Sequence, residues 1–139
     1  DHLGYGGDMS GSLNPDSLQI HNGADDNASG TAGILELTHK LAMNKKLLGR
    51  SIIAICFDAE EKGLLGSKFY SQNPTKDLEQ AIIMINMDMI GRLNEKPITI
   101  GGVGSANSLS KTIDGIKQNH KLKIDHQRPA QFLMHFGLL

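Results

Sequence analysis

Three acidic residues lie close together in one short stretch of the chain. Residues 57–63 read FDAEEKG, so that Asp58, Glu60 and Glu61 directly follow an apolar run rich in β-branched residues. Two adjacent glutamates repel one another unless a cation or a shared proton relieves them. The stretch is therefore a candidate metal or acid–base site, and a solvated turn between a strand and a helix is the open alternative.

Two further acidic positions have a similar placement. Residues 23–30 read GADDNASG and lead into a helical pattern, with Asp26 and Asn27 at the helix start. Helix capping explains one acid or amide there but not three in a row, so capping and metal binding both stay open. Asp88 follows a second apolar run, over residues 81–87.

The three sites would meet if the two apolar runs were neighbouring strands of one parallel sheet, because such sheets bind ligands at their carboxyl edge. Carboxylates gathered there repel unless cations neutralise them, and two metal ions roughly 3.5 to 4 Å apart are a common solution. A nearby glutamate outside the ligand set could then act as a general base. A calcium loop is disfavoured because no D-x-D-x-D-G pattern occurs, and residues 101–104 (GGVG) lack the Lys-Ser/Thr of a phosphate loop.

The apolar patterns predict the elements that would position these acids. The runs at 51–57 and 81–87 are short and apolar, as buried strands are. Helical spacing predicts three helices, over residues 28–44, 64–72 and 106–117. In the last of them we expect Leu109, Ile113 and Ile116 to face inward.

Weaker signals complete the expected fold. Short strands are predicted at 97–100 and 122–124, whereas residues 1–24 read as a loop punctuated by glycines. Strand, helix and strand in succession indicate a right-handed βαβ unit. We therefore expect an α/β fold, with a mostly parallel sheet flanked by helices on both faces and incomplete at both ends.

Length and composition exclude several classes of protein. A chain of 139 residues suits one domain, and a net charge of −1 gives no basic footprint for nucleic acid. No apolar run approaches the roughly 18 to 20 residues of a membrane helix, and no signal peptide is seen.

Cys56 reads as a small buried hydrophobe. The start at Asp1 without methionine suggests a piece of a longer protein, whose exposed edges would favour self-association.

Four motifs in this order resemble the M28 family of zinc aminopeptidases. They are residues 1–4 (DHLG), 23–30 (GADDNASG), 57–67 (FDAEEKGLLGS) and 86–92 (NMDMIGR). The resemblance covers the chain to about residue 125, so residues 1–139 read as one partial peptidase domain with a motif-bearing core at 1–92. The tail at 127–139 lies outside the resemblance. The implied fold is the α/β/α sandwich of the zinc exopeptidases.

The resemblance implies a role for each matching acid. Asp26 would bridge two zinc ions, with Glu61 bound to one ion and Asp88 to the other. Glu60 would be the general base and would not bind metal. The implied cofactor is therefore a pair of zinc ions, held by this short chain only weakly.

The resemblance also places two supporting residues and the ligand histidines. Asp1 matches an aspartate that orients a ligand histidine, and Asn27 would follow Asp26 across a peptide bond that is often cis in the family. The first ligand histidine would lie two positions before Asp1. The second would follow the region that matches His126, and neither His126 nor His135 stands in the expected context. The remaining histidines are expected near the site without binding metal, or on the surface: His2, His21, His39 and His120.

The function implied by the resemblance is hydrolysis of N-terminal peptide bonds, with a peptide carrying a free N-terminus as substrate. A non-catalytic receptor or dimerisation domain of the same fold is the main alternative, and the retention of Asp26, Glu60, Glu61 and Asp88 argues against it. A related carboxypeptidase or glutaminyl cyclase would keep the fold and change the substrate. The resemblance leans toward a periplasmic or secreted enzyme, and the preferred N-terminal residue stays open.

Overall fold

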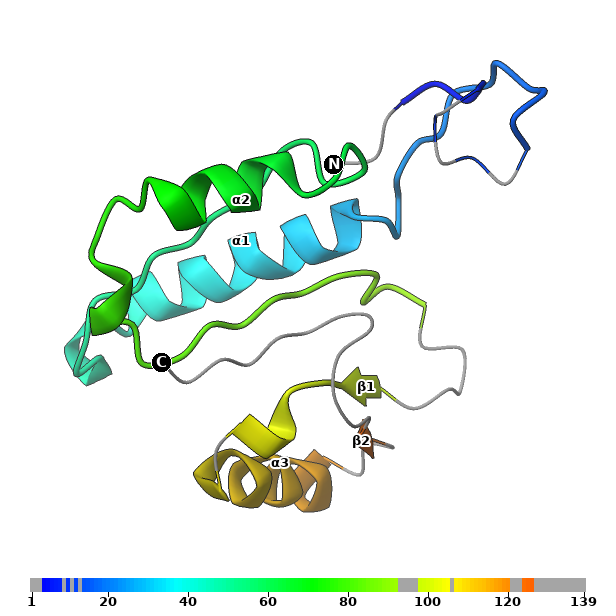
Figure 1. The fold of residues 1–139 in the computed structure, drawn as a ribbon. Coiled ribbons are helices and arrows are strands. Elements are labelled where there is room, and N and C mark those ends of the chain that lie inside the picture. The colour runs from blue at the N-terminus through cyan, green and yellow to red at the C-terminus, as the bar shows by residue number, and fades with distance from the viewer. Residues whose placement is uncertain are drawn as a thin grey trace. The chain divides into compact units, whose positions relative to one another are not determined.

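A computed structural model describes this chain at residues 4–8, 10, 12, 14–92, 98–105, 107–120 and 124–126. The chain divides into two compact units, Asp1–Thr75 and Lys76–Leu139. Figure 1 labels the helices α1 and α2 of the first unit and the elements β1, α3 and β2 of the second.

The longest element of the first unit is helix α1, Ala28–Met43. Asn27 caps its start, because the Asn27 side chain accepts a hydrogen bond from the Gly30 amide at 3.1 Å. At the other end the Asn44 amide donates to the Leu41 carbonyl, and a single 3₁₀ turn, η1 (Lys45–Leu47), follows. The predicted helix over residues 28–44 is thus confirmed.

Helix α2, Leu65–Gln72, follows the acidic stretch and confirms the helix predicted at 64–72. It ends where the Asn73 amide donates to the Phe69 carbonyl at 2.8 Å, directly before Pro74, which disfavours a further helical residue ahead of it. The ring of Tyr70 lies 5.8 Å from that of Phe57, measured between ring centroids. This contact ties the helix to the apolar segment that precedes the acidic stretch.

The second unit contains a strand–helix–strand arrangement. Strands β1 (Ile98–Ile100) and β2 (Ile124–His126) pair in parallel, with Ile98 opposite Ile124 and Ile100 opposite His126. Two short 3₁₀ turns, η2 (Leu78–Gln80) and η3 (Val103–Ser105), also belong to this unit. Helix α3, Asn107–His120, connects the strands, as a parallel pair requires. The helix predicted at 106–117 is confirmed, and the strands predicted at 97–100 and 122–124 overlap β1 and β2; residues 97, 106, 122 and 123 lie outside the described residues.

Helix α3 packs against η3 and forms the small core of this unit. Val103, Leu109 and Ile113 are buried, Ile113 the most deeply at 5% exposure. Ile116 was expected to face inward as well, but it is 41% exposed, so that part of the prediction is wrong. The buried face of α3 therefore ends before Ile116 and is shorter than the apolar spacing of the sequence predicts.

The two longer strand predictions differ from what the structure shows. It assigns no strand to residues 51–57, and none to residues 81–87 apart from a single β-bridge at Met84. Side chains expected to be buried are about half exposed, such as Ile52 at 51% and Ile85 at 49%. A strand forms only when a neighbour takes up its backbone hydrogen bonds, and an apolar run by itself does not supply that neighbour. The larger parallel sheet stays a prediction.

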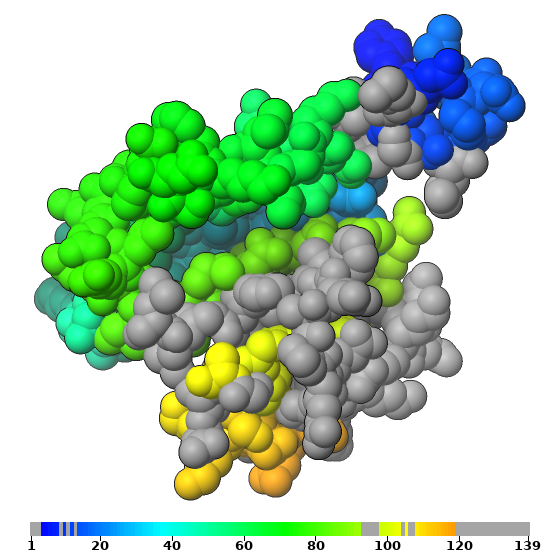
Figure 2. All heavy atoms as spheres, in the orientation of Figure 1, coloured from blue at the N-terminus to red at the C-terminus, as the bar shows by residue number. Residues whose placement is uncertain are grey.

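Several large apolar side chains of the first unit are exposed. Figure 2 shows α2 and the turn before it at the surface. Leu65 and Phe69 of this helix are more than half exposed, as is Leu35 of α1. Among the described helices, none combines the length and apolar character that crossing a membrane requires.

Candidate active site

The start of α1 holds three consecutive polar residues that the structure uses in different ways. Asp25 is buried, and the Ser29 hydroxyl donates to its main-chain oxygen at 2.6 Å and lies 3.2 Å from its carboxylate. Asn27 caps the helix through Gly30. Asp26 lies between Asp25 and Asn27 and is half-buried. Capping therefore accounts for Asn27.

The bond between Asp26 and Asn27 is a cis peptide. This is the arrangement that the resemblance implies for these two positions, so that expectation is confirmed. The loop before it is closed by a hydrogen bond from the Ala28 amide to the Gly23 carbonyl at 2.9 Å.

The acidic stretch folds as a compact turn that leads into α2. The Gly63 and Leu64 amides both donate to the Glu60 carbonyl, at 2.9 and 2.8 Å. The Leu65 amide donates to the Ala59 carbonyl at 3.2 Å. Three residues of this turn have a positive φ, a backbone conformation that is uncommon for residues other than glycine. They are Ala59 at 54°, Leu64 at 63° and Gly63 at 98°.

A close approach between Asp58 and Gly66 completes this turn. The Gly66 amide donates to the Asp58 carbonyl at 3.1 Å, and a side chain at Gly66 would collide with the Asp58 backbone. Glu60 is exposed and Glu61 is half-buried. The turn thus presents two adjacent carboxylates from a backbone that hydrogen bonds hold on both sides.

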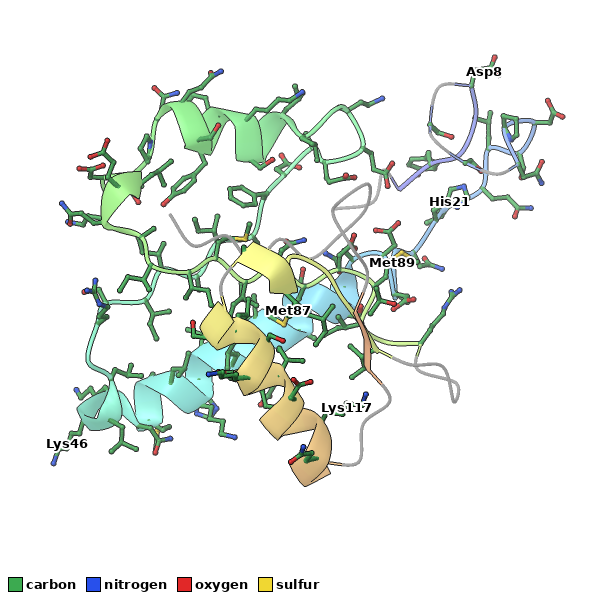
Figure 3. All side chains as sticks on the ribbon, turned by 60° about the horizontal axis from the view of Figure 1, so that its bottom comes forward. Asp8, His21, Lys46, Met87, Met89 and Lys117 are labelled. Atoms are coloured by element: carbon green, nitrogen blue, oxygen red, sulfur yellow. The ribbon has the colours of Figure 1, made fainter. Side chains whose placement is uncertain are left out.

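The remaining predicted site residues lie in different parts of the chain. Asp88 is half-buried in the second unit and precedes a turn over residues 89–91, where Met89 has a φ of 49°. Asp1 lies outside the described residues. Figure 3 draws the side chains, with His21 on the loop that leads to α1. His39 lies exposed on α1, and His126 belongs to strand β2.

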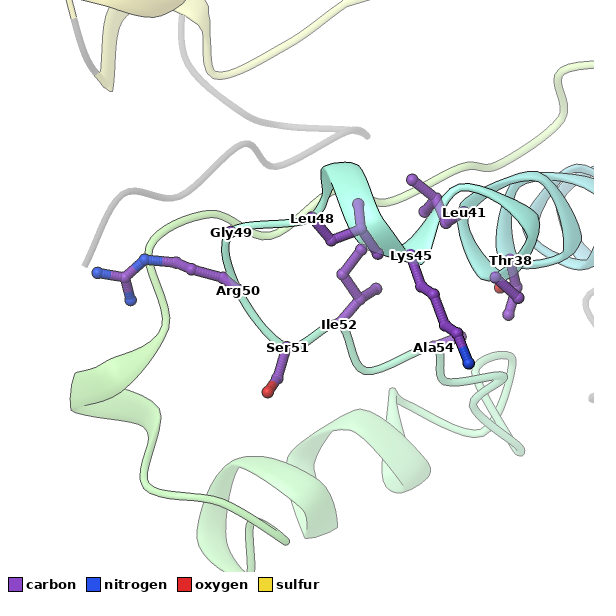
Figure 4. A pocket seen from close by; sticks show the side chains of 10 residues that line it. Thr38, Leu41, Lys45, Leu48, Gly49, Arg50, Ser51, Ile52 and Ala54 are labelled. Carbon is purple, nitrogen blue, oxygen red and sulfur yellow. The ribbon is translucent and has the colours of Figure 1, made fainter.

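A hollow of about 560 Å³ lies at the far end of α1 from Asp26 (Figure 4). Leu41, Leu48 and Ile52 contribute aliphatic walls, and Lys45 and Arg50 contribute cations. None of the predicted catalytic or metal-binding residues lines it. The candidate catalytic and metal-binding residues therefore lie outside this hollow.

Zinc accepts carboxylate oxygens, so Asp26, Glu61 and Asp88 have suitable donor chemistry. Asp26 and Glu61 belong to the first unit and Asp88 to the second. Within the part of the chain that the structure describes, no group of three or more His, Cys, Asp or Glu side chains is placed to hold a metal ion. The types of donor fit zinc, whereas the described residues do not assemble a ligand set.

Sequence reasoning singled out Glu60 and Glu61 but gave no role to the residues that hold them. The structure adds Asp58, Ala59 and Gly66 as the residues that shape the turn. The signal available in the sequence was the pair of glycines at positions 63 and 66, directly after the acids and at the start of a helical pattern.

The turn at residues 58–66 presents two adjacent glutamates, and carboxylates are common ligands of catalytic metal ions. Comparison with known proteins gives the family: the chain belongs to peptidase family M28, whose sequence model matches residues 15–134. The resemblance found in the motifs is confirmed. The match includes the stretches that carry Asp26, Glu60, Glu61 and Asp88, and it ends within the tail segment 127–139.

Curated relatives agree with this assignment. The chain is 39% identical over 82 residues to aminopeptidase YwaD of Bacillus subtilis (strain 168), covering 58% of this chain and 18% of that protein. It is 34% identical over 96 residues to leucine aminopeptidase 2 of Trichophyton equinum, covering 68% and 19%. A probable leucine aminopeptidase of Arthroderma benhamiae is 36% identical over 73 residues, covering 50% and 20%. The chain spans about a fifth of the length of these relatives. No solved structure matches it.

Proposed function

We propose that this chain carries the general base and the carboxylate ligands of a di-zinc aminopeptidase. Glu60 would be the base, and Asp26, Glu61 and Asp88 would hold the metal ions. The observation that carries the proposal is the turn at residues 58–66, which presents Glu60 and Glu61 side by side from a hydrogen-bonded backbone. Membership of peptidase family M28 and relatives named as aminopeptidases support it.

Glu60 is suited to proton transfer because its side chain is exposed while its main chain is held by two hydrogen bonds. In the proposed reaction it takes a proton from the attacking water and passes it to the leaving amine. The two zinc ions, when bound, would lower the pKa of that water and polarise the scissile carbonyl. The substrate would be a peptide with a free N-terminus.

We also propose the α/β fold with a mostly parallel sheet. The parallel pair β1–β2 joined by α3 supports it, because parallel strands need a crossover of this kind. In such a fold, the segments that precede Glu60 and Asp88 would be neighbouring strands, and their acids would share one edge of the sheet.

The test distinguishes the proposed general base, Glu60, from the proposed zinc ligand, Glu61, by measuring zinc content and the rate of hydrolysis. In the complete gene product, Glu60→Gln should retain zinc and lower the rate of aminoacyl anilide cleavage by about 10² to 10⁴-fold. Glu61→Gln should lose zinc as well as rate. Glu36→Gln, an exposed position on α1, is the matched control and should change neither.

The opposite results would identify the alternatives. A wild-type protein that neither binds zinc nor cleaves the anilide would favour a non-catalytic receptor or dimerisation domain. Zinc binding together with cleavage at the carboxyl end of a peptide, or with cyclisation of an N-terminal glutamine, would favour the related chemistries.

A further inference from the structure

We propose that Asp58 is a positioning residue for Glu60. Its side chain would fix the backbone of Ala59, and Ala59 in turn sets the direction in which Glu60 leaves the chain. This inference rests on the proposed function of Glu60 as general base. It names a residue that does not itself touch substrate or metal.

The contacts of Asp58 converge on the turn from two sides. Its carboxylate accepts a hydrogen bond from the Ala59 amide at 2.7 Å. Its main-chain carbonyl accepts from the Gly66 amide at 3.1 Å. Asp58 therefore contacts the residue directly before Glu60 through its side chain, and the second residue of α2 through its main chain.

The side-chain contact of Asp58 is important because of the backbone conformation of Ala59. Its φ of 54° lies in the left-handed region, which residues with a Cβ adopt only when their surroundings enforce it. The Leu65 amide holds the carbonyl that follows Ala59, and the Asp58 carboxylate holds the amide that precedes it, which fixes the plane of the peptide bond between Asp58 and Ala59. If the Asp58 contact is removed, the peptide plane between Asp58 and Ala59 can rotate, and the Cα–Cβ bond of Glu60 turns with it.

The main chain after Glu60 would not correct such a rotation. The Gly63 and Leu64 amides hold the Glu60 carbonyl, which follows the Cα of Glu60 along the chain, whereas Ala59 precedes it. A base must lie within hydrogen-bond reach of the proton it takes, and a displacement of about 1 Å can cost about 10²-fold in rate. The expected effect of losing the Asp58 contact is therefore on turnover and not on substrate binding.

Two substitutions distinguish the effect of the Asp58 hydrogen-bond acceptor from the effect of its negative charge. Asp58→Asn keeps an oxygen that can accept from the Ala59 amide, and it removes the negative charge. Asp58→Ala removes both. The matched control is Asp77→Ala, because the Asp77 carboxylate makes the same kind of bond, to the Glu79 amide at 3.0 Å, at the start of η2 in the other unit.

The experiment uses the complete gene product and measures kcat and KM for an aminoacyl anilide, zinc content, and the midpoint of thermal unfolding. Asp58→Ala should lower kcat about 10 to 100-fold, with KM within threefold and zinc unchanged. Asp58→Asn should stay within about threefold of the wild-type kcat, and Asp77→Ala should match the wild type. If Asp58→Ala does not fold, the kcat of Asp58→Asn decides, because a positioning role requires it to be close to the wild type.

Three results would overturn the inference. Asp58→Asn as slow as Asp58→Ala would mean that the charge matters and not the acceptor. Loss of zinc in Asp58→Ala would make Asp58 part of metal binding, and an unchanged kcat would remove its role. Glu60→Gln with full activity would instead refute the proposed function, so the two failures are distinguishable.

Discussion

Replacing Gly66 by alanine should destabilise the first unit, although alanine is the better helix former. Gly66 is the second residue of α2 and lies against the backbone of Asp58. A Cβ built on Gly66 would be 2.5 Å from the Asp58 carbonyl oxygen and 2.9 Å from the Asp58 nitrogen. Both are backbone atoms, so no side-chain rotation can relieve the contact.

The expected size follows from three contributions. Crowding of this kind typically costs about 1–3 kcal/mol. Weakening the hydrogen bond from the Gly66 amide to the Asp58 carbonyl adds about 1 kcal/mol. The gain in helix propensity offsets about 0.5–1 kcal/mol. The free energy of unfolding should therefore fall by about 1–3 kcal/mol in Gly66→Ala.

Gly115 in α3 supplies a control at which the same substitution should raise, and not lower, the free energy of unfolding. A Cβ at Gly115 would meet nothing within 4 Å, so Gly115→Ala should raise the free energy of unfolding by about 0.5–1 kcal/mol. Urea unfolding of the two variants and the wild type, followed by circular dichroism, measures both. A gain in stability for Gly66→Ala equal to that for Gly115→Ala would refute the close approach of α2 to Asp58.

Two further stability predictions test the helices directly. Asn27→Ala should lower the free energy of unfolding by about 0.5–2 kcal/mol by removing the cap on Gly30, whereas Asn27→Ser should be nearly neutral, as urea unfolding would reveal. Ile113→Ala should cost about 2–5 kcal/mol because Ile113 is 5% exposed. Ile116→Ala, at a position 41% exposed, should cost less than about 1 kcal/mol, and equal losses at the two positions would contradict the packing of α3.

The helices were predictable from the sequence because their signals are local. A cap at Asn27, a stop at Asn73-Pro74 and apolar spacing in α3 each act within a few residues. The apolar runs at 51–57 and 81–87 gave an equally clear strand signal, yet a strand depends on a partner that its own sequence does not specify. That difference explains why the helices agree with the prediction and the strands predicted at 51–57 and 81–87 do not.

The candidate site was predictable as residue types, and less so as geometry. The motifs predict Asp26, Glu60, Glu61 and Asp88 as site residues, which stays a prediction, and the cis bond before Asn27 agrees with the resemblance. The hydrogen bonds of Asp58 and the left-handed Ala59 could not be predicted, because backbone conformations in a turn depend on contacts formed after the helix docks.

The most direct test of the central claim is a crystal structure of the complete gene product with zinc, recorded so that anomalous scattering locates the metal. We predict zinc–oxygen distances of about 2.0–2.2 Å to Asp26, Glu61 and Asp88, with the Glu60 carboxylate outside the coordination sphere of both ions. Coordination by Glu60, or by Asp25 in place of Asp26, would contradict the assignment of base and ligands.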